Sequence, residues 1–447
     1  MDTVLLARLQ FAFTIGFHFI FPPISIGLAW ALVVIEGLGW RTGDQAWVRL
    51  GKFFGKLLAI TFAVGVATGV VMEFQFGTNW ATYSRFVGDV FGAPLAAEAV
   101  FAFFLESGFL GLYLFGRNRV SRGVHWFAIL MVAVGATLSA FWILVANSWQ
   151  QTPAGFTLAN GRAELTSFAE AVWNPSSLPR FFHTMVAALV TGGFAVMGAS
   201  AWLALKGKSP ELAPRALKLG AAFALAASLL ALYPTGHWHA QQVAATQPEK
   251  FAAIEGIFDS QRAAPLVVFG IPGTDPPGLS ARIEIPGLGS WLAHGDVEAE
   301  VKGLRDFPAD QVPRGAEFVL SFLSFHHMVM LGMLFIGLSG LAALLAWRRR
   351  LATTRWFLWL LVLASPLPVA ACQLGWITAE VGRQPWIVYR LLRTAEAASP
   401  SVSAGEILAS LIGFGLVYLL LGALWLYLVL KKVAQGPEPP PAAGGGA

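Results

Sequence analysis

Charged residues and cysteine are both scarce in this sequence, and each scarcity argues against a class of protein. Asp, Glu, Lys and Arg together form only 12% of the 447 residues, whereas soluble globular proteins carry about 25%. Hydrophobic residues form 56% of the chain. This balance argues against a soluble multidomain protein and predicts a polytopic membrane protein.

The chain has one cysteine, Cys372. This count excludes an internal disulfide framework, a cysteine-ligated iron–sulfur cluster and covalent attachment of a c-type haem. The net charge of +5 does not indicate nucleic-acid binding, because the basic residues lie in loops between apolar runs. The first residues lack the basic segment and cleavage site of a signal peptide, so the first apolar run is predicted to be a retained span.

Nine apolar runs are long enough to cross a bilayer, which takes about 20 residues. They cover residues 11–37, 57–76, 95–115, 125–146, 182–205, 217–235, 317–347, 356–377 and 406–430. An unpaired peptide group costs several kcal/mol in hydrocarbon, so continuous apolar runs of this length are expected to be helices. The predicted fold is therefore an all-α, polytopic membrane helical bundle with nine transmembrane helices.

Basic residues gather in alternate loops, and this pattern predicts the orientation. The basic loops contain Arg41, Arg49, Lys52, Lys56, Arg117, Arg119, Arg122, Lys206, Lys208, Arg215, Lys218, Arg348, Arg349, Arg350, Arg355, Lys431 and Lys432. By the positive-inside rule these loops are cytoplasmic, which places the amino terminus outside and the carboxyl terminus inside.

This orientation divides the chain into four parts. Residues 1–235 form spans one to six, and residues 236–316 form a long external loop that is rich in Pro and Gly. Residues 317–432 form spans seven to nine. The segment 433–447 is of low complexity and is predicted to be a disordered cytoplasmic tail.

Ionisable residues inside the spans are few, and such residues are functional candidates because hydrocarbon disfavours them. They are His18, Glu36, Glu73, Glu98, Glu106, His183, His326, His327 and Glu380. With the predicted orientation, most of the potential ligands converge on the outer half of the bilayer, whereas Glu106 lies deeper. The alternative is a hydrogen bond between helices for each histidine, and an interfacial position for Glu36 and Glu73.

Glu98 and Glu106 are eight residues apart, which in a regular helix means about 12 Å of rise and roughly 80° of rotation. They cannot bind one metal ion together at that separation. They could instead be two stations of a proton path, or two protonated carboxyl groups that bond to neighbouring helices.

Two further combinations suggest haem. Glu380 and Arg383 precede the sequence Gln384-Pro385-Trp386, where Arg383 could hold a haem propionate, although a local ion pair is the simpler alternative. Histidine with methionine, and histidine with carboxylate, are axial ligand sets suited to haem iron. A haem–copper centre is set aside because the spans hold too few histidines for its ligands.

Six segments of the chain resemble subunit I of the cytochrome bd quinol oxidases, in the order of that family and in its version with a short quinol-binding loop. They are RLQFAFTIGFHF (8–19), GVATGVVMEFQFGTNW (65–80), FGAPLAAEAVFAFFLES (91–107), SAFWILVANSW (139–149), QPEKFAAIE (247–255) and GWITAEVGRQPW (375–386). The resemblance extends over most of the chain from Arg8 to Lys432.

The resemblance implies three haems and their ligands. His183 and Met328 match the axial pair of a low-spin haem b. His18 and Glu380 match the ligands of two high-spin haems, one of type b and one of type d, or a further haem b in its place. Which of the two ligands serves which high-spin haem stays open.

The other motif residues match further roles in the family. Glu98 matches a carboxylate at the high-spin haem pocket, and Glu106 with Ser139 matches the proton route from the cytoplasm. Lys250 and Glu255 match quinol-loop residues. Trp376 and Arg383 match a tryptophan between haems and the arginine of the GRQPW motif.

One position departs from the family pattern. The string FHHMV places His326 where the family usually has an arginine, two residues before the methionine ligand. A titratable group thus replaces a permanent cation near the expected haem propionates. The potential and the methionine ligation of the low-spin haem depend on this difference.

The resemblance implies an enzyme of the bacterial inner membrane that oxidises quinol at the outer face. It reduces O2 to water with protons from the cytoplasm, and so builds a proton gradient. A second large membrane subunit, and in some cases a small single-span one, are the implied partners. Two alternatives remain: a proton-coupled transporter that uses Glu98 and Glu106, and a haem-bearing quinone sensor or an oxidase with b-type haems alone.

Overall fold

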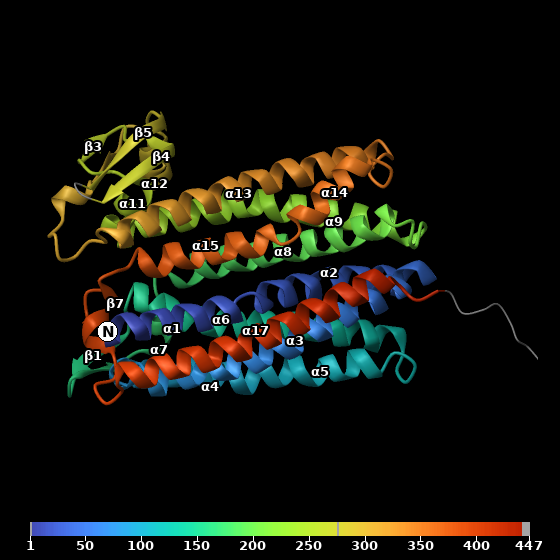
Figure 1. Ribbon diagram of the computed structural model, residues 1–447, viewed down its shortest axis with the longest axis horizontal. Coiled ribbons are helices and arrows are strands. Elements are labelled where there is room, and N and C mark those ends of the chain that lie inside the picture. The colour runs from blue at the N-terminus through green and yellow to red at the C-terminus, as the bar shows by residue number, and fades with distance from the viewer. Residues whose placement is uncertain (1, 275–276, 440–447) are drawn as a thin grey trace, which may run out of the picture.

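The computed structural model describes residues 2–274 and 277–439. Within these ranges, nine helical segments are long and apolar enough to cross a membrane, which confirms the predicted number of spans. Their helices run side by side along the long axis of the molecule (Figure 1). All-α architecture is confirmed, because the strands are confined to short loop hairpins.

The spans are built from the following helices, several of which are joined in pairs or threes: α1 (Thr3–His18) and α2 (Phe21–Thr42); α3 (Gln45–Thr78); α4 (Ala81–Ala97), η1 (Glu98–Phe103) and α5 (Phe104–Phe115); α6 (Arg122–Gln151); α8 (Ser177–Leu205); α9 (Leu212–Leu230), η2 (Ala231–Gly236) and α10 (His237–Thr246); α13 (Ala316–Trp347); α14 (Arg355–Ala364) and α15 (Leu367–Val381); and α17 (Ala404–Gln435).

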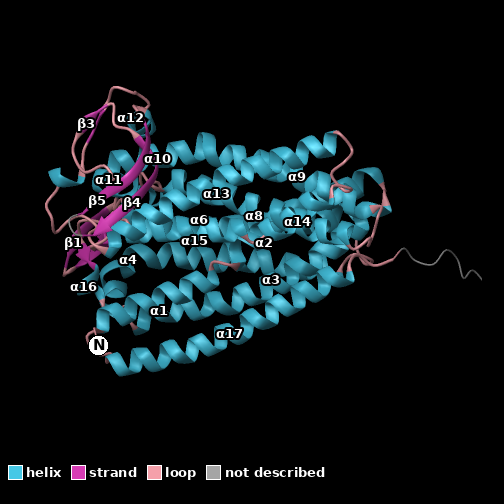
Figure 2. Cartoon of the chain, turned by 45° about the horizontal axis from the view of Figure 1, so that its top comes forward, coloured by secondary structure: helices cyan, strands magenta, loops and turns pink. Residues whose placement is uncertain are grey.

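The loops contain shorter elements: β1 (Phe156–Ala159), β2 (Arg162–Leu165), α7 (Phe168–Val172), α11 (Pro248–Glu255), β3 (Gln261–Arg262), β4 (Leu266–Thr274), β5 (Pro277–Ile285), α12 (Leu288–His294), β6 (Glu300–Val301), η3 (Leu304–Asp306), β7 (Trp386–Val388), β8 (Leu392–Arg393) and α16 (Thr394–Ala397). The strands form four antiparallel pairs, β1–β2, β3–β6, β4–β5 and β7–β8. All of them gather at one end of the bundle, where the loop between α10 and α13 also folds (Figure 2).

Polar caps set the ends of several spans. The Asp2 carboxylate accepts a hydrogen bond from Val4 N at 2.9 Å at the start of α1. Ser403 and Glu406 form a reciprocal capping box at the start of α17. At the end of α2, Gly43 adopts a left-handed conformation with φ of 70°, which glycine reaches without the steric cost of a side chain.

Small residues allow the central helices to contact each other through their backbones. Gly27 on α2 faces Ala188 and Gly192 on α8, and a Cβ atom at Gly27 would overlap the backbone of both. Gly193 on the same helix meets Ala224 of α9 in the same way, with an added Cβ 2.8 Å from the Ala224 Cβ. Such close approach is the usual source of helix association in lipid, where burying apolar area contributes little.

The helices extend beyond most of the predicted spans, and two of these differences change the predicted division of the chain. The sixth span was expected to end at residue 235, but helix continues to Thr246 beyond a break at Tyr233, whose φ and ψ are −144° and 127°. Helix α17 extends to Gln435, so the first three residues of the predicted disordered tail are helical. Residues 440–447 of that tail lie outside the described residues.

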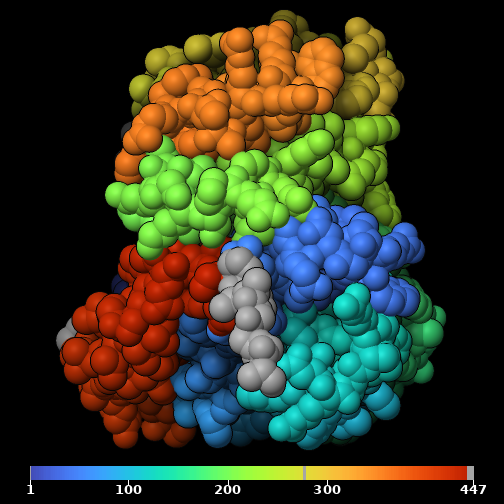
Figure 3. Space-filling view, turned by 90° about the vertical axis from the view of Figure 1, so that its right-hand side faces the viewer, coloured from blue at the N-terminus to red at the C-terminus, as the bar shows by residue number. Residues whose placement is uncertain are grey.

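Glu36, for which an interfacial position was one expectation, is buried within the protein near one end of the bundle. Its side chain is 5% exposed and accepts hydrogen bonds from Tyr113 Oη at 2.9 Å and from both terminal nitrogens of Arg117. Gly51 of α3 lies against the carboxylate and leaves no room for a side chain. The ion pair therefore joins α2 to the end of α5 at the bundle end opposite the strands, the end viewed in Figure 3.

Replacing Arg117 with methionine is expected to lower the melting temperature of the purified protein. The substitution leaves the buried Glu36 carboxylate without its cation, a change that costs about 3–5 kcal/mol. Thermal unfolding followed by circular dichroism measures the effect. Arg119→Met, two residues away and exposed, is the matched control and should melt like the parent. Equal melting temperatures for both variants would contradict the stabilising role of this pair.

Candidate functional site

His18 lies where the first span is interrupted. It is the last residue of α1, and α2 begins at Phe21 with prolines at its next two positions. The His18 ring is held against α3, with Nδ1 3.0 Å from Thr68 Oγ1. Gly69 makes room for the ring, because a Cβ atom there would lie 3.2 Å from His18 Cε1.

Glu98 is the first residue of the π-helix η1, a local widening that is frequent at functional sites. Its Oε1 accepts a hydrogen bond from Ser139 Oγ of α6 at 2.7 Å. Glu106, which is 8% exposed, packs against Gly135 of α6, one helical turn from Ser139. A Cβ atom added at Gly135 would lie 2.9 Å from the Glu106 Cβ. The predicted rotation of 80° assumed a regular helix, and the wider turns of η1 bring both glutamates against α6.

His183 faces the break in the sixth span. Thr235 of η2 places Oγ1 3.5 Å from His183 Nδ1, and the ring centroids of His183 and His239 are 5.6 Å apart. A Cβ atom at Gly236 would lie 3.5 Å from His183 Cε1. The ring is therefore surrounded by η2 and the start of α10.

Met328 of α13 packs against the turn of α15 that carries Trp376. A Cβ atom at Gly375 would lie 3.0 Å from Met328 Sδ, so this glycine makes room for the methionine. The next residue, Trp376, has its ring centroid 5.5 Å from that of Phe19, the neighbour of His18. One turn of α15 therefore lies between the Met328 side and the His18 side of the bundle.

Glu380 is the centre of a partly buried hydrogen-bond network at the end of α15 that lies nearest the strands. Its Oε1 accepts from Asn147 Nδ2 at 3.0 Å and its Oε2 accepts from Arg383 Nη2 at 2.5 Å. Arg180 of α8 donates to Asn147 Oδ1 at 3.1 Å. The expected pair of Glu380 and Arg383 is present, and it belongs to a larger cluster.

Positive charge exceeds negative charge around Glu380. Arg180, Lys250 and Arg383 are each at most 5% exposed, and Glu380 is the carboxylate that bonds directly to this group. Two buried polar atoms nearby, Arg180 Nε and Trp376 Nε1, have no hydrogen-bond partner among the described residues. A group with acidic side chains, such as the propionates of a haem, would complete this cluster, so the residues present fit a haem.

Lys250 points into the bundle. The side chain is 2% exposed, and Nζ donates to Gln151 Oε1 at 3.1 Å and to the carbonyl oxygen of Ala379 at 2.8 Å. Burial, together with the positive charge of Arg180, holds the pKa of Lys250 well below its usual value. Lys250 therefore fastens α11 to the turn that carries Glu380.

Glu255, at the other end of α11, has a contrasting environment. Its side chain is fully buried, and neither carboxyl oxygen has a hydrogen-bond partner among the described residues. Burial raises the pKa of Glu255 to about 8. A carboxyl group of this kind can exchange a proton near neutral pH, which is the property of a general base.

His326 contacts the external hairpin. Its Nε2 lies 2.7 Å from the carbonyl oxygen of Val267 in β4, and its Nδ1 lies 2.8 Å from that of Phe322. The ring thus ties β4 to α13 at the level of the external loop. Its role as a replacement for a propionate-binding arginine stays a prediction.

Several residues of the site were not found from the sequence. Asn147 and Gln151 complete the network around Glu380 and Lys250, and Thr68 supports His18. The polar run Asn147-Ser148-Trp149-Gln150-Gln151 at the end of an apolar span was the available signal for two of them. Arg180, which bonds to Asn147, belongs to none of the motifs in the sequence analysis.

Fold and site together define a polytopic membrane protein with ligand candidates for haem on five of its spans. Residues 6–437 match the family model described as cytochrome bd terminal oxidase subunit I. The chain therefore belongs to the cytochrome bd terminal oxidase subunit I family, an oxidoreductase family whose name implies haem.

Named relatives and a solved structure agree with this assignment. The chain is 41% identical to cytochrome bd ubiquinol oxidase subunit 1 of Bacillus subtilis (strain 168), over 98% of this chain and 95% of the relative. It is 36% identical to cytochrome bd-II ubiquinol oxidase subunit 1 of Escherichia coli (strain K12), over 98% and 97%. The bd oxidase structure from Geobacillus thermodenitrificans superposes with a TM-score of 0.92 at 32% identity, over 98% of this chain and 99% of that chain.

Replacing Lys250 with methionine is expected to loosen α11. The variant loses two hydrogen bonds of about 1 kcal/mol each, so amide hydrogen exchange across residues 248–255 should accelerate roughly tenfold or more. Mass-spectrometric exchange on the purified complex measures this. Lys302→Met, on an exposed loop position, should leave exchange in that segment unchanged. Unaltered exchange in the Lys250 variant would show that these bonds do not hold the helix.

Proposed function

We propose that this chain is the haem-bearing subunit of a quinol:oxygen oxidoreductase that oxidises membrane quinol at the outer face and reduces O2 to water. The relatives above are named ubiquinol oxidases. The main support for the proposal is a contact between the external loop and α15. Lys250 of the loop donates a hydrogen bond to the carbonyl oxygen of Ala379, the residue next to Glu380. A quinol-binding loop and a ligand candidate are thereby parts of one buried network.

The residues that would hold haem follow from this placement. His183 and Met328 are proposed for a low-spin haem b, and His18 and Glu380 for two high-spin haems of types b and d, or b alone. Arg383 and Arg180 would meet propionates, and Glu98 lies at the high-spin pocket. Haem iron supplies one-electron transfer and an oxygen-binding position when it is bound.

Glu255 is proposed to accept a proton from the quinol hydroxyl. Its carboxyl group is buried without a partner, so a quinol oxygen that reaches it would meet no competing hydrogen bond. Lys250, whose Nζ is already bonded to α6 and α15, is proposed as a positioning residue for α11. The resemblance implied a quinol-loop role for Lys250, and the proposal specifies this role as the positioning of α11.

Glu106, Ser139 and Glu98 are proposed to carry protons from the cytoplasmic side. All three lie along the contact between α5, η1 and α6, and Ser139 already donates to Glu98. If the amino terminus is outside, as the basic loops predict, uptake from the inside separates charge across the membrane. Each proton moved against 100 mV then stores about 2.3 kcal/mol.

The partners are proposed in the same way. The relatives are named as subunit 1 of their oxidases, which implies a second subunit here, and a further small single-span subunit stays a prediction. A transporter has no support from the family assignment. An oxidase with b-type haems alone stays open and is distinguished from the bd type by its lack of a red-shifted chlorin absorbance band.

Glu255→Gln is expected to slow quinol-driven oxygen uptake by the purified complex about hundredfold, the usual contribution of a general base. Because the ionised carboxylate is the active form and its pKa is about 8, uptake by the parent should rise between pH 6 and 9. The variant should lack this rise. Oxygen-electrode measurements with ubiquinol and menaquinol analogues give both values.

Glu298→Gln, on an exposed loop position, is the control and should keep the parent rate and pH profile. Haem content should be equal in all three proteins. Normal turnover of Glu255→Gln would remove its proposed role, and a haem-loaded parent complex that consumes no oxygen with either quinol would refute the proposed function itself.

His183→Ala is expected to abolish the low-spin haem b signal in the reduced-minus-oxidised absorbance spectrum, because alanine offers no axial nitrogen. The high-spin signals should persist, since His18 and Glu380 lie on other helices. His294→Ala, at an exposed loop histidine, should give the parent spectrum. An unchanged low-spin band in His183→Ala would refute the ligand assignment.

A further inference from the structure

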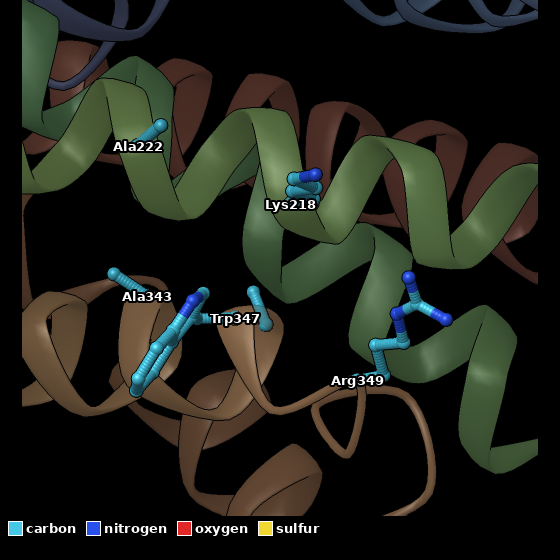
Figure 4. A pocket seen from close by; sticks show the side chains of 6 residues that line it. Lys218, Ala222, Ala343, Trp347 and Arg349 are labelled. Carbon is cyan, nitrogen blue, oxygen red and sulfur yellow. The ribbon is translucent and has the colours of Figure 1, made fainter.

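A cavity of about 440 Å³ lies between α9 and α13, at the end of the bundle opposite the β4–β5 hairpin. Its lining residues are Lys218, Ala222, Ala343, Ala346, Trp347 and Arg349. Figure 4 shows Lys218 and Ala222 on α9, Ala343 and Trp347 on α13, and the Arg349 side chain reaching from the loop after α13 toward α9. No part of the haem or quinol site lies in this cavity.

The lining changes from charged to apolar along the bundle axis. Arg349 follows the last residue of α13 by two positions, and Trp347 is that last residue. Ala343 is one helical turn, about 6 Å, further into the span, and Ala222 lies one turn deeper than Lys218 on α9. Two cations at the mouth, an indole and Ala346 beside them, and Ala222 and Ala343 one turn deeper follow the order of phosphate, glycerol and acyl chain in a phospholipid.

The two cations lack partners in the protein. Among residues 2–274 and 277–439, no ion pair and no side-chain hydrogen bond involves Lys218 or Arg349, and the cavity lining contains no acidic residue. Arg349 also has φ of 58°, an uncommon backbone conformation for a residue other than glycine.

A second cavity on the other side of α9 provides a comparison. It shares Lys218 and Ala222 and is also lined by Leu38, Trp47, Arg215 and Leu219. There, Arg215 is neutralised by Asp44 and by Glu211, the latter at 3.8 Å. Lys218 is common to both cavities, so the cavity between α9 and α13 differs in containing Arg349, which forms no ion pair among the described residues, where the second cavity contains the neutralised Arg215.

We propose that the cavity between α9 and α13 binds an anionic phospholipid, with its phosphate between Lys218 and Arg349 and an acyl chain along Ala222 and Ala343. Basic pockets between helices at a membrane face are suited to such head groups. A soluble phosphate would use the two cations but not the apolar wall, so the lipid is the occupant that matches the whole lining.

The test is a titration of the detergent-purified complex with phosphatidylglycerol, followed by native mass spectrometry. Removal of one basic residue near an anionic group is expected to weaken binding about fivefold. The double variant Lys218→Ala/Arg349→Ala should therefore bind its tightest-bound lipid roughly 25-fold more weakly than the parent does. Lys218→Arg should bind like the parent. Arg41→Ala/Arg119→Ala removes two exposed cations, one in the last turn of α2 and one in the loop after α5, from the same end of the bundle and should leave this lipid in place.

Three competing outcomes would overturn the proposal. Equal binding of phosphatidylcholine would mean a general lipid crevice, and displacement by millimolar inorganic phosphate would mean a site for a soluble anion. Undiminished lipid binding by the double alanine variant would place the lipid elsewhere. An unchanged melting temperature and visible spectrum of each variant show that it has folded, and both cations are exposed, so folding should be retained.

Discussion

A polar group inside the membrane must find its partner within the protein, because hydrocarbon offers none. This constraint organises the end of the bundle that carries the strands. Glu380 is bonded to Asn147 and Arg383, Arg180 bonds to Asn147, and Lys250 bonds to Gln151 and Ala379. Segments far apart in the sequence are held together there by charge and hydrogen bonding.

Interruptions in the helices place the candidate ligands. His18 ends α1, Glu98 begins η1, and His183 faces η2. A continuous helix satisfies its own backbone hydrogen bonds and presents its side chains at a fixed spacing. A break leaves some of these backbone groups without their helical partners and changes the spacing of the side chains. Glycines at positions 69, 236 and 375 provide the space beside His18, His183 and Met328. Breaks and glycines together leave room for a large planar cofactor among tightly packed helices.

The number of spans, the helical fold class and the residue types at the site could be predicted from the sequence. The length of an apolar run and the presence of an ionisable residue within it are local properties, which can be read without knowledge of the tertiary contacts. The sequence did not predict that Glu36 is buried with Arg117, or that Lys250 faces the bundle, because these contacts join residues 81 and 129 positions apart. The π-helix at Glu98 was also missed, since Ser139, the α6 partner of Glu98, lies in a different span. The proline at position 234 marked the break in the sixth span, but not the helix beyond it.

The central claim is that the polar side chains of the spans toward the strand-bearing end of this bundle hold iron porphyrins. Extraction and quantification of haem from the intact purified complex tests it most directly. The account predicts three haems for each copy of this chain, with b-type bands and, for the bd type, a chlorin band that shifts with carbon monoxide. A colourless complex that yields no porphyrin would contradict it.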